Sequence, residues 1–379
     1  MHHVKESKMK ALSILIKPVS GNCNMRCGYC FYADVAINRQ TPNLGTMTLD
    51  ILETIVKKAL SETTVSCAFG FQGGEPTLAS LDFYRALVEF ERKYNVNRVE
   101  ILHTIQTNGL LIDERWAQFL AENRFLVGLS IDANKSVHDG LRHDIHGKGT
   151  HNRCIKTAGI LAKNKVEFNV LSVVTHQFAM HPDKAYHFFK QNGFRHIQLM
   201  PCLDGLEEEQ GRHFFSLDPK SYGSFLKRFF DLWYEDFISG DYISVRAFDN
   251  YIYMLGGHPP ENCAMGGCCD AYPLVEADGS VYPCDFYALD EFLLGKIQTN
   301  TFEEMLSGEK VKRFTSPTRS IHEKCRVCEF FAVCRGGCRR NREPIIDGIP
   351  SLNYLCEAYR MFFSHSLDRM KILAKRLFD

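Results

Sequence analysis

Short apolar runs alternate with helical patterns from residue 11 to about residue 200. The runs, bounded by turn-forming residues, predict six strands, at 12–16, 67–71, 99–105, 126–131, 167–174 and 196–200. Helical periodicity predicts helices at 49–60, 81–93, 114–123, 152–163 and 182–191, and a further, aromatic-striped helix at 222–237. Because strands and helices alternate, we expect an α/β fold in which a parallel sheet with right-handed crossovers curves into a partial (β/α)6 barrel.

Polar, glycine-rich segments follow the first four predicted strands. A cysteine-rich loop follows the first, QGGEP (72–76) the second, QTNG (106–109) the third and SID (130–132) the fourth. In parallel α/β sheets the ligand lies at the carboxyl ends of the strands. Each segment alone indicates only a turn, but four of them on one rim, beside thiols, predict a functional site there.

Composition and charge narrow the class of protein. A chain of 379 residues can form one large domain and a smaller one. Its 45 Lys and Arg residues balance 45 Asp and Glu residues, which argues against nucleic acid or an anionic membrane as the main partner. No apolar run reaches the roughly 18–20 residues of a membrane span, and the basic start of the chain does not resemble a signal peptide. We therefore expect a soluble, cytoplasmic protein.

Fifteen cysteines are many for a cytoplasmic chain of this length. Disulfides do not persist in a reducing compartment, and clustered thiols there more often bind metal. Three cysteines stand alone and are expected to be buried as small apolar side chains: Cys67, Cys154 and Cys202. The remaining twelve form a group of three near the start and a group of nine between residues 263 and 356.

The first group, Cys23, Cys27 and Cys30, has the spacing CxxxCxxC in the loop after the first strand. Three thiols are one short of a closed zinc or iron–sulfur site. The spacing alone leaves two interpretations open. One is a zinc site with a distant fourth ligand, and the other is a [4Fe–4S] cluster with one iron free to bind a small molecule.

The nine C-terminal cysteines predict a second metal-binding region. Four have the spacing CxxCxxxxxCxxxC and the others flank them: Cys325, Cys328, Cys334 and Cys338, with Cys263, Cys268, Cys269, Cys284 and Cys356. Structural zinc is the main alternative to iron–sulfur clusters here. We predict a barrel domain at 1–240, with its core at about 11–205 and one following helix, and a metal-stapled domain at 241–379 that ends in a helix.

The sequence CGYCFY in the first cysteine loop, together with GGEP, resembles the signature of radical S-adenosylmethionine (radical SAM) enzymes. The resemblance implies that Cys23, Cys27 and Cys30 hold a [4Fe–4S] cluster whose open iron binds S-adenosylmethionine, the source of a 5′-deoxyadenosyl radical. It implies cofactor contacts from rim residues: Gly73, Gly74 and Glu75 along the methionine, Ser130 and Arg142 at its carboxylate and ribose, and Tyr32 and Gln72 nearby. From the residues alone, Arg142 could equally lie on the surface and Tyr32 in the core.

The nine C-terminal cysteines resemble the SPASM extension of peptide-modifying radical enzymes, in which Gly279 precedes Cys284 by five residues. The resemblance implies two auxiliary [4Fe–4S] clusters, and thus three clusters in all. Their ligands would be Cys263, Cys269, Cys284 and Cys338 for the first, and Cys325, Cys328, Cys334 and Cys356 for the second. The family spacing favours Cys269 over the adjacent Cys268, and the choice stays open. Clusters closed by four thiolates would carry electrons.

Longer stretches, from roughly residue 12 to 365, are similar to anaerobic sulfatase-maturating enzymes, among them QTNGLLIDERWAQFLAENRFLVGLSIDA and VYPCDFYALDEFLLGKI. The resemblance implies oxygen-independent oxidation of a sulfatase cysteine or serine to Cα-formylglycine. The radical would take a Cβ hydrogen, Asp285 would take the thiol or hydroxyl proton as general base, and the cluster at Cys284 would accept the second electron. Hydrolysis of a thioaldehyde would then yield formylglycine. From the residues alone, Asp285 could equally be a surface aspartate.

The resemblance also implies partners. They are an unfolded sulfatase segment with Cys/Ser-x-Pro/Ala-x-Arg and an electron donor of the flavodoxin or ferredoxin type, and the expected state is a monomer. One alternative is another SPASM peptide maturase that forms a thioether or carbon–carbon crosslink, although the short stretch before the first strand disfavours it. A non-catalytic, zinc-stapled binding protein is the other. The sequence does not distinguish cysteine from serine as the target, and the basic run 335–343 is expected to be a solvated loop.

Overall fold

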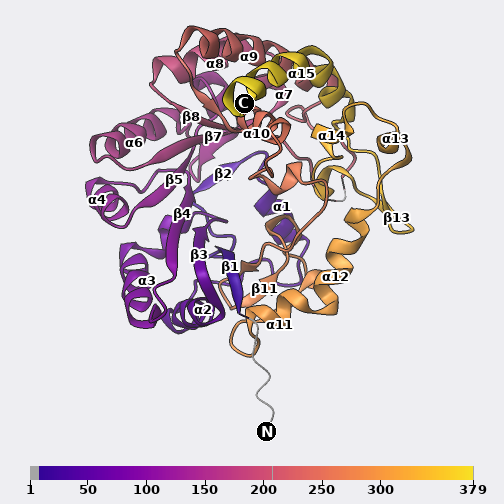
Figure 1. The fold of residues 1–379 in the computed structure, drawn as a ribbon. Coiled ribbons are helices and arrows are strands. Elements are labelled where there is room, and N and C mark those ends of the chain that lie inside the picture. The colour runs from indigo at the N-terminus through magenta and orange to yellow at the C-terminus, as the bar shows by residue number, and fades with distance from the viewer. Residues whose placement is uncertain (1–7, 207, 379) are drawn as a thin grey trace.

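A curved sheet of ten strands organises the chain, and its order is β12-β11-β10-β1-β3-β4-β5-β7-β8-β9 (Figure 1). The computed structural model describes residues 8–206 and 208–378. The start of the chain, where no signal peptide is expected, lies partly outside these residues. The central strands run parallel to one another: β1 (Met9–Ile16), β3 (Thr63–Phe71), β4 (Glu100–Thr107), β5 (Phe125–Ser130), β7 (Phe168–Val174) and β8 (His196–Pro201). These are the six predicted strands, and the expected α/β partial barrel is confirmed.

The predicted helices cover the outer face of this sheet (Figure 1). They are α2 (Leu49–Glu62), α3 (Leu81–Tyr94), α4 (Glu114–Glu122), α6 (His151–Lys163) and α8 (Pro182–Gln191). Local chemistry explains where they start: the side chains of Thr48 and Asp113 accept hydrogen bonds from the first-turn amides of α2 and α4, and Pro182 opens α8. Each buries one apolar face, which is why the 3.6-residue period was visible in the sequence.

Segments from the second half of the chain extend the sheet at both edges. β9 (Ser244–Val245) pairs with β8, and β10 (Leu274–Val275) pairs with β1 in parallel. β11 (Ser280–Tyr282) and β12 (Gly295–Lys296) then continue the sheet antiparallel. Such short strands carry no readable period, so the sequence did not predict them. The division of the chain at residue 240 stays a prediction.

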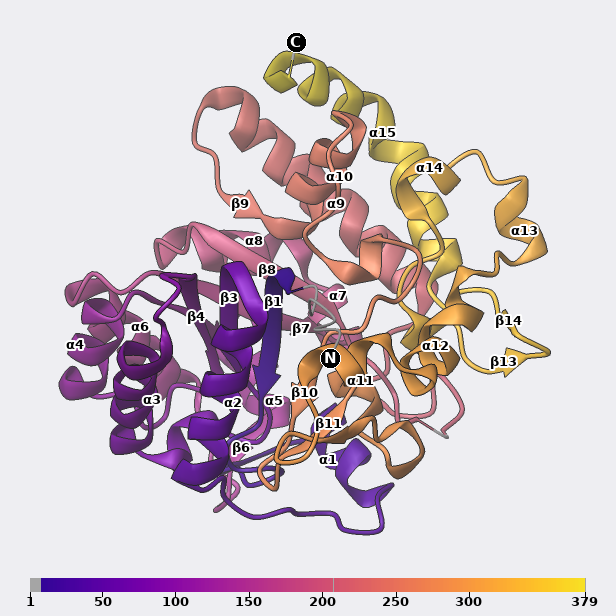
Figure 2. The ribbon, with the colours of Figure 1, turned by 60° about the horizontal axis from the view of Figure 1, so that its bottom comes forward.

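The aromatic stripe predicted at 222–237 is core. It belongs to α9 (Pro219–Ser239), which packs with α15 (Cys356–Phe378), and α15 also contacts α10 (Arg246–Leu255), as Figure 2 shows. Phe230 lies 5.2 Å from Phe248 and 5.8 Å from Phe362 between ring centroids. Although α9 and α15 are long, no helix within the described ranges is both long and apolar enough to cross a membrane.

The remaining elements are short. The helices are α1 (Phe31–Ile37), α5 (Lys135–Leu141), α7 (His176–Ala179), α11 (Phe302–Ser307), α12 (Glu309–Thr315), α13 (Glu323–Arg326) and α14 (Phe331–Cys334). Two small sheets pair β2 (Met25–Cys27) with β6 (Arg142–Asp144) and β13 (Ile345–Ile346) with β14 (Ile349–Pro350). The first of these ties the cysteine loop to the segment after α5.

A fully buried ion trio joins the two halves of the chain. Glu276, which follows β10, accepts hydrogen bonds from Lys17 Nζ at 2.7 Å and from Arg39 Nη1 at 2.6 Å. Burial alone would raise the pKa of Glu276, but the two cations hold it below its ordinary value. Because Lys17 and Arg39 flank the first cysteine loop, the trio anchors both ends of that loop to the sheet.

Replacing Glu276 with alanine should lower the free energy of unfolding by about 3–5 kcal/mol, because two buried cations lose their anion. Anaerobic urea denaturation followed by circular dichroism measures the change. Glu309→Ala is the matched control: it removes the exposed partner of Lys312 and should leave the midpoint nearly unchanged. Equal shifts for the two variants would contradict the anchoring role of the trio.

Candidate active site

The first cysteine loop lies at the carboxyl end of β1, on the rim that the sequence predicted. Burial, together with the neighbouring Glu75, Cys27 and Cys30, raises the pKa of the Cys23 thiol to about 12, so the three thiols lie together. Met25 N donates to Cys23 Sγ at 3.3 Å. Cys27 is opposite Arg142 in the β2–β6 pair, which brings the loop and that arginine into one place.

QGGEP needs its glycines because the backbone approaches the cysteine loop closely. Gly74 has φ +57°, and a Cβ there would lie 2.2 Å from the carbonyl oxygen of Asn22. Gly73 has φ +91°, and a Cβ there would lie 2.5 Å from the side chain of Lys17. No other residue fits both the conformation and the space, so the two glycines let the second rim segment pack directly on the first.

Glu75 is fixed at the centre of the rim and is only 1% exposed. Its Oε1 accepts hydrogen bonds from Thr107 Oγ1 at 2.7 Å and from the amide of Thr77 at 3.1 Å, and its Oε2 accepts one from Asn108 N at 2.8 Å. Burial raises the pKa of this carboxyl group while these donors oppose the rise. A carboxylate has about four acceptor positions, and Oε2 keeps room for another donor.

Arg142 is buried, with 6% of its surface exposed, so the alternative of a surface arginine is wrong. Its Nη1 donates to Tyr29 Oη at 2.8 Å, and Tyr29 donates in turn to Asp132. Its buried Nε has no partner among the described residues. Neither Tyr29 nor Asp132 was singled out from the sequence, although both lie inside predicted rim segments. Ser130, which the resemblance assigned with Arg142 to the carboxylate and ribose of the cofactor, accepts a hydrogen bond from Gln106 Nε2 at 2.9 Å.

Asp285 lies across from the rim, next to the start of α1. Tyr32 Oη donates to Asp285 Oδ2 at 3.0 Å, and the Cys284 thiol lies 3.5 Å from Asp285 Oδ1. Burial raises the pKa of Asp285, and the hydrogen bonds from Tyr32 and Cys284 oppose the rise. Gln72 lies near the Tyr32 side chain. The carboxylate is therefore held between the first cysteine loop and the C-terminal cysteines rather than on the surface.

The C-terminal thiols form two sets. Burial raises the pKa of Cys338 to about 12, with Cys269 and Cys263 as charged neighbours, and Cys284 has Cys338 and Cys269 as neighbours. In the second set, burial raises the pKa of Cys334 to about 11, and its neighbours are Cys356, Cys325 and Cys328. The structure thus brings together the same eight cysteines that the resemblance grouped. That they are ligands stays a prediction.

Within residues 8–206 and 208–378, no three His, Cys, Asp or Glu side chains converge closely enough to hold one metal ion. The isolated cysteines, Cys67, Cys154 and Cys202, are buried as expected.

The basic run 335–343 is not the solvated loop that its composition suggested. Arg339, Arg340 and Arg342 are all buried. Arg339 donates to Glu343 at 2.9 Å and its guanidinium lies 4.6 Å from the Phe314 ring centroid, while Arg340 donates to the carbonyl oxygen of Asp204 at 2.6 Å. Arginines can be buried when their stems pack and their heads are bonded, and charge count alone could not reveal this.

Comparison with known proteins agrees with this geometry. The Radical SAM superfamily model matches residues 18–210, and the SPASM model, an iron-sulfur cluster-binding domain, matches residues 268–329. A cysteine-type anaerobic sulfatase-maturating enzyme of Clostridium novyi is 45% identical, with 97% of this chain and 99% of the relative covered. A serine-type enzyme of Bacteroides thetaiotaomicron is 33% identical, with 98% and 93% covered.

Solved structures show the same likeness. Native anSMEcpe with bound AdoMet has a TM-score of 0.93 and 45% identity, covering 96% of this chain and 99% of that one. The same enzyme with bound AdoMet and the Cp18Cys peptide has a TM-score of 0.93 and 44% identity, covering 97% and 99%. Relatives this similar over almost the whole length confirm the resemblance seen in the sequence. The chain belongs to the anaerobic sulfatase-maturating enzymes of the radical SAM superfamily.

Proposed function

We propose that this protein oxidises a cysteine residue of a sulfatase polypeptide to Cα-formylglycine without oxygen. The observation that carries the proposal is the carboxylate of Asp285, held by Tyr32 between the first cysteine loop and a thiol of the C-terminal sets. Cysteine is favoured over serine as the target, because the cysteine-type relatives are 44–45% identical and the serine-type relatives 27–33%. A crosslinking peptide maturase is not favoured.

The rim residues would hold the reactive cofactor. Cys23, Cys27 and Cys30 would bind a [4Fe–4S] cluster, and S-adenosylmethionine on this cluster supplies the one-electron chemistry that removes a hydrogen atom from the substrate. The open acceptor position on Glu75 suits an ammonium group, and the unpartnered Nε of Arg142 suits a carboxylate. The remaining contacts would come from residues around them: Tyr32, Gln72, Gly73, Gly74 and Ser130.

The eight C-terminal thiols would hold two further [4Fe–4S] clusters. Cys263, Cys269, Cys284 and Cys338 would bind the first, and Cys325, Cys328, Cys334 and Cys356 the second. Four thiolates for each cluster leave no iron for substrate, so these sites would carry electrons. Because Cys284 adjoins Asp285, the proposed proton acceptor would lie next to a ligand of the cluster proposed to accept the electron.

Asp285 would act as general base. It would accept the thiol proton of the target cysteine, and burial favours this role because it makes the carboxylate a stronger base than an exposed aspartate. Tyr32 fixes the orientation of the carboxylate through Oδ2. The substrate would be an unfolded segment with Cys-x-Pro-x-Arg. A flavodoxin- or ferredoxin-type donor and a monomeric state belong to the same proposal.

Substituting Cys268 and Cys269 one at a time shows which of the two is the cluster ligand and which thiol binds no cluster. Anaerobically reconstituted wild-type protein should hold about twelve irons for three four-iron clusters. Cys269→Ala should lower iron content by up to one cluster, whereas Cys268→Ala, its matched control, should retain all three. Iron and sulfide analysis with Mössbauer spectroscopy measures both. Stoichiometric zinc in the wild-type protein would rule out the radical SAM assignment of these sites.

Asp285→Asn should lower the rate of aldehyde formation by about 10²–10⁴-fold, the usual contribution of a general base. Cleavage of S-adenosylmethionine to 5′-deoxyadenosine should continue, because the first hydrogen removal does not use this carboxylate. Mass spectrometry of a Cys-x-Pro-x-Arg peptide and chromatography of the nucleoside measure the two products. Asp278→Asn, on the same hairpin and bonded to Lys296 at 2.9 Å, is the control. Full aldehyde formation by Asp285→Asn would show that another group is the base.

Tyr32→Phe should move the acidic limb of the pH–rate profile to higher pH. The hydroxyl hydrogen bond favours the ionised carboxylate, so its loss raises the pKa of Asp285 further. A base acts only when ionised, and activity is therefore lost at a higher pH as the medium is acidified. Tyr287→Phe is the control, because Tyr287 bonds Glu343 at 2.7 Å and not Asp285. An unshifted limb in Tyr32→Phe would contradict Asp285 as the titrating group.

A further inference from the structure

Arg342 is a buried cation, and two of its three guanidinium nitrogens have no hydrogen-bond partner among the described residues. Only 6% of its surface is exposed, and its Nε and Nη2 atoms have no hydrogen-bond acceptor among residues 8–206 and 208–378. A buried guanidinium that lacks an acceptor costs considerable free energy. An anionic group that is not part of the polypeptide is therefore expected beside Arg342.

The two neighbouring arginines make the contrast clear. Arg339 is bonded to Glu343 and to the carbonyl oxygen of Phe314 at 2.8 Å, and Arg340 is bonded to the carbonyl oxygen of Asp204. Both are buried to a similar degree, yet both have protein acceptors. Of the three buried arginines in the basic run, two thus have protein acceptors for their side chains and one is left available.

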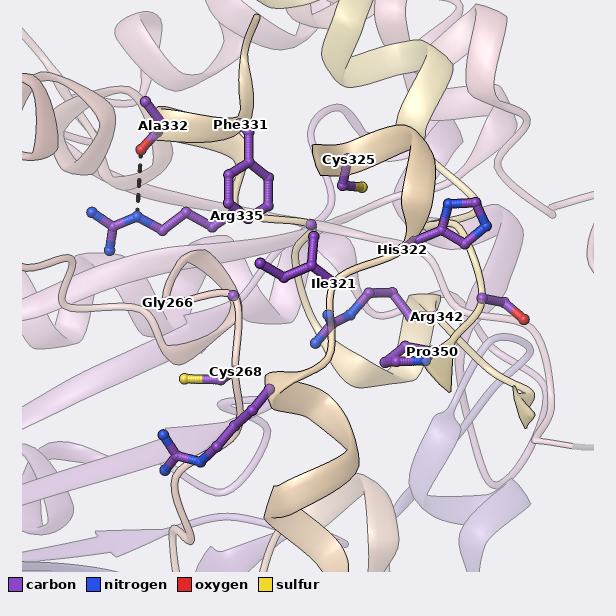
Figure 3. A pocket seen from close by; sticks show the side chains of 14 residues that line it. Gly266, Cys268, Ile321, His322, Cys325, Phe331, Ala332, Arg335, Arg342 and Pro350 are labelled. Carbon is purple, nitrogen blue, oxygen red and sulfur yellow. Dashed lines mark hydrogen bonds between the residues drawn. The ribbon is translucent and has the colours of Figure 1, made fainter. Parts of the chain in front are cut away.

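Arg342 lines a cavity of about 490 Å³ together with Cys268, His322 and Cys325. Figure 3 shows it in this cavity, between the segment of Cys325 and that of Cys268. Gly336 lies beside the guanidinium: a Cβ added there would be 3.5 Å from Arg342 Nη1, an ordinary contact distance.

The charge of Arg342 reaches one thiol of each C-terminal set. Burial raises the pKa of Cys269 and of Cys325, and Arg342 opposes the rise at both. Near Cys269, Arg339 has the same effect, but its charge is already paired with Glu343. At Cys325 the other charged neighbours are thiols, Cys356 and Cys328. Arg342 is thus a buried positive charge that acts on both sets, whereas Arg360 and Lys324, which act on Cys356 of the second set, are exposed.

We propose that Arg342 is a positioning residue that supplies a buried positive charge beside the second auxiliary cluster, the one held by the set containing Cys325, and raises its reduction potential. The inference depends on the proposed function, because it assumes that the two sets hold clusters. Four thiolates around a four-iron core carry net negative charge, and one-electron reduction adds one more. A fixed cation in a low-dielectric site stabilises the reduced form more than the oxidised form.

Redox titration of the reconstituted holoenzyme, followed by electron paramagnetic resonance, tests this inference. Arg342→Gln removes the charge at similar side-chain length. At a fixed potential it should shift the ratio of reduced to oxidised second cluster about tenfold toward the oxidised form, which is about 59 mV for a one-electron couple. Arg319→Gln is the matched control: Arg319 lines the same cavity, but its side chain is exposed and lies 3.6 Å from Asp270, so solvent screens its charge.

Arg342→Lys keeps the charge and should keep the potential near that of the wild-type protein. An unchanged potential in Arg342→Gln with full iron content would overturn the inference. Should Arg342→Gln lose the second cluster, iron retention by Arg342→Lys would support charge compensation, and equal loss by both variants would overturn it. A wild-type protein with fewer than three clusters would instead contradict the proposed function, so the two failures are distinguishable.

Discussion

The buried trio of Lys17, Glu276 and Arg39 is the contact on which the site depends. Lys17 follows β1 and Arg39 follows α1, so the segment between them contains all three cysteines of the first loop and Tyr32. Glu276 brings the second half of the chain to this segment through the β1–β10 pair. Lys17 also fills the space beside Gly73, and its Nζ lies 5.1 Å from the Tyr32 ring centroid. One ionic centre therefore fixes the cysteine loop, the glycine-rich rim and Tyr32 against one another.

Buried charged side chains recur in the molecule. Where such a side chain has no partner among the described residues, we expect a bound group of opposite charge. Glu276 has two cations, and Arg339 and Arg340 have acceptors of their own. Arg39, Arg142 and Arg342 each keep a buried Nε without an acceptor among the described residues, but Arg39 is paired with Glu276, whereas Arg142 and Arg342 lie beside predicted metal-binding thiols. Since an unpaired buried charge is costly, these two arginines indicate the positions of anionic groups, one at the rim and one between the C-terminal sets.

Sequence reasoning succeeded where periodicity or spacing carries the signal. The six central strands are short apolar runs, the helices between them repeat with a period of 3.6 residues because each buries one face, and the rim segments follow from parallel topology. It failed for β9 to β12, which are two or three residues long, and for the basic run at 335–343. Arginine is polar on every hydropathy scale, so only the tertiary structure shows that Arg342 is buried, beside Gly336.

The sequence by itself determined the fold class, the open three-thiol loop and the family resemblance, because element periodicity and cysteine spacing are local properties of the chain. The tertiary structure alone decided which distant residues meet. It placed Cys269 and not Cys268 beside Cys338, Tyr32 against Asp285 across more than 250 positions, and Arg342 between the two thiol sets. Such meetings depend on how strands from the two halves pair and on which charges can be buried together, and neither is encoded within any short stretch of sequence.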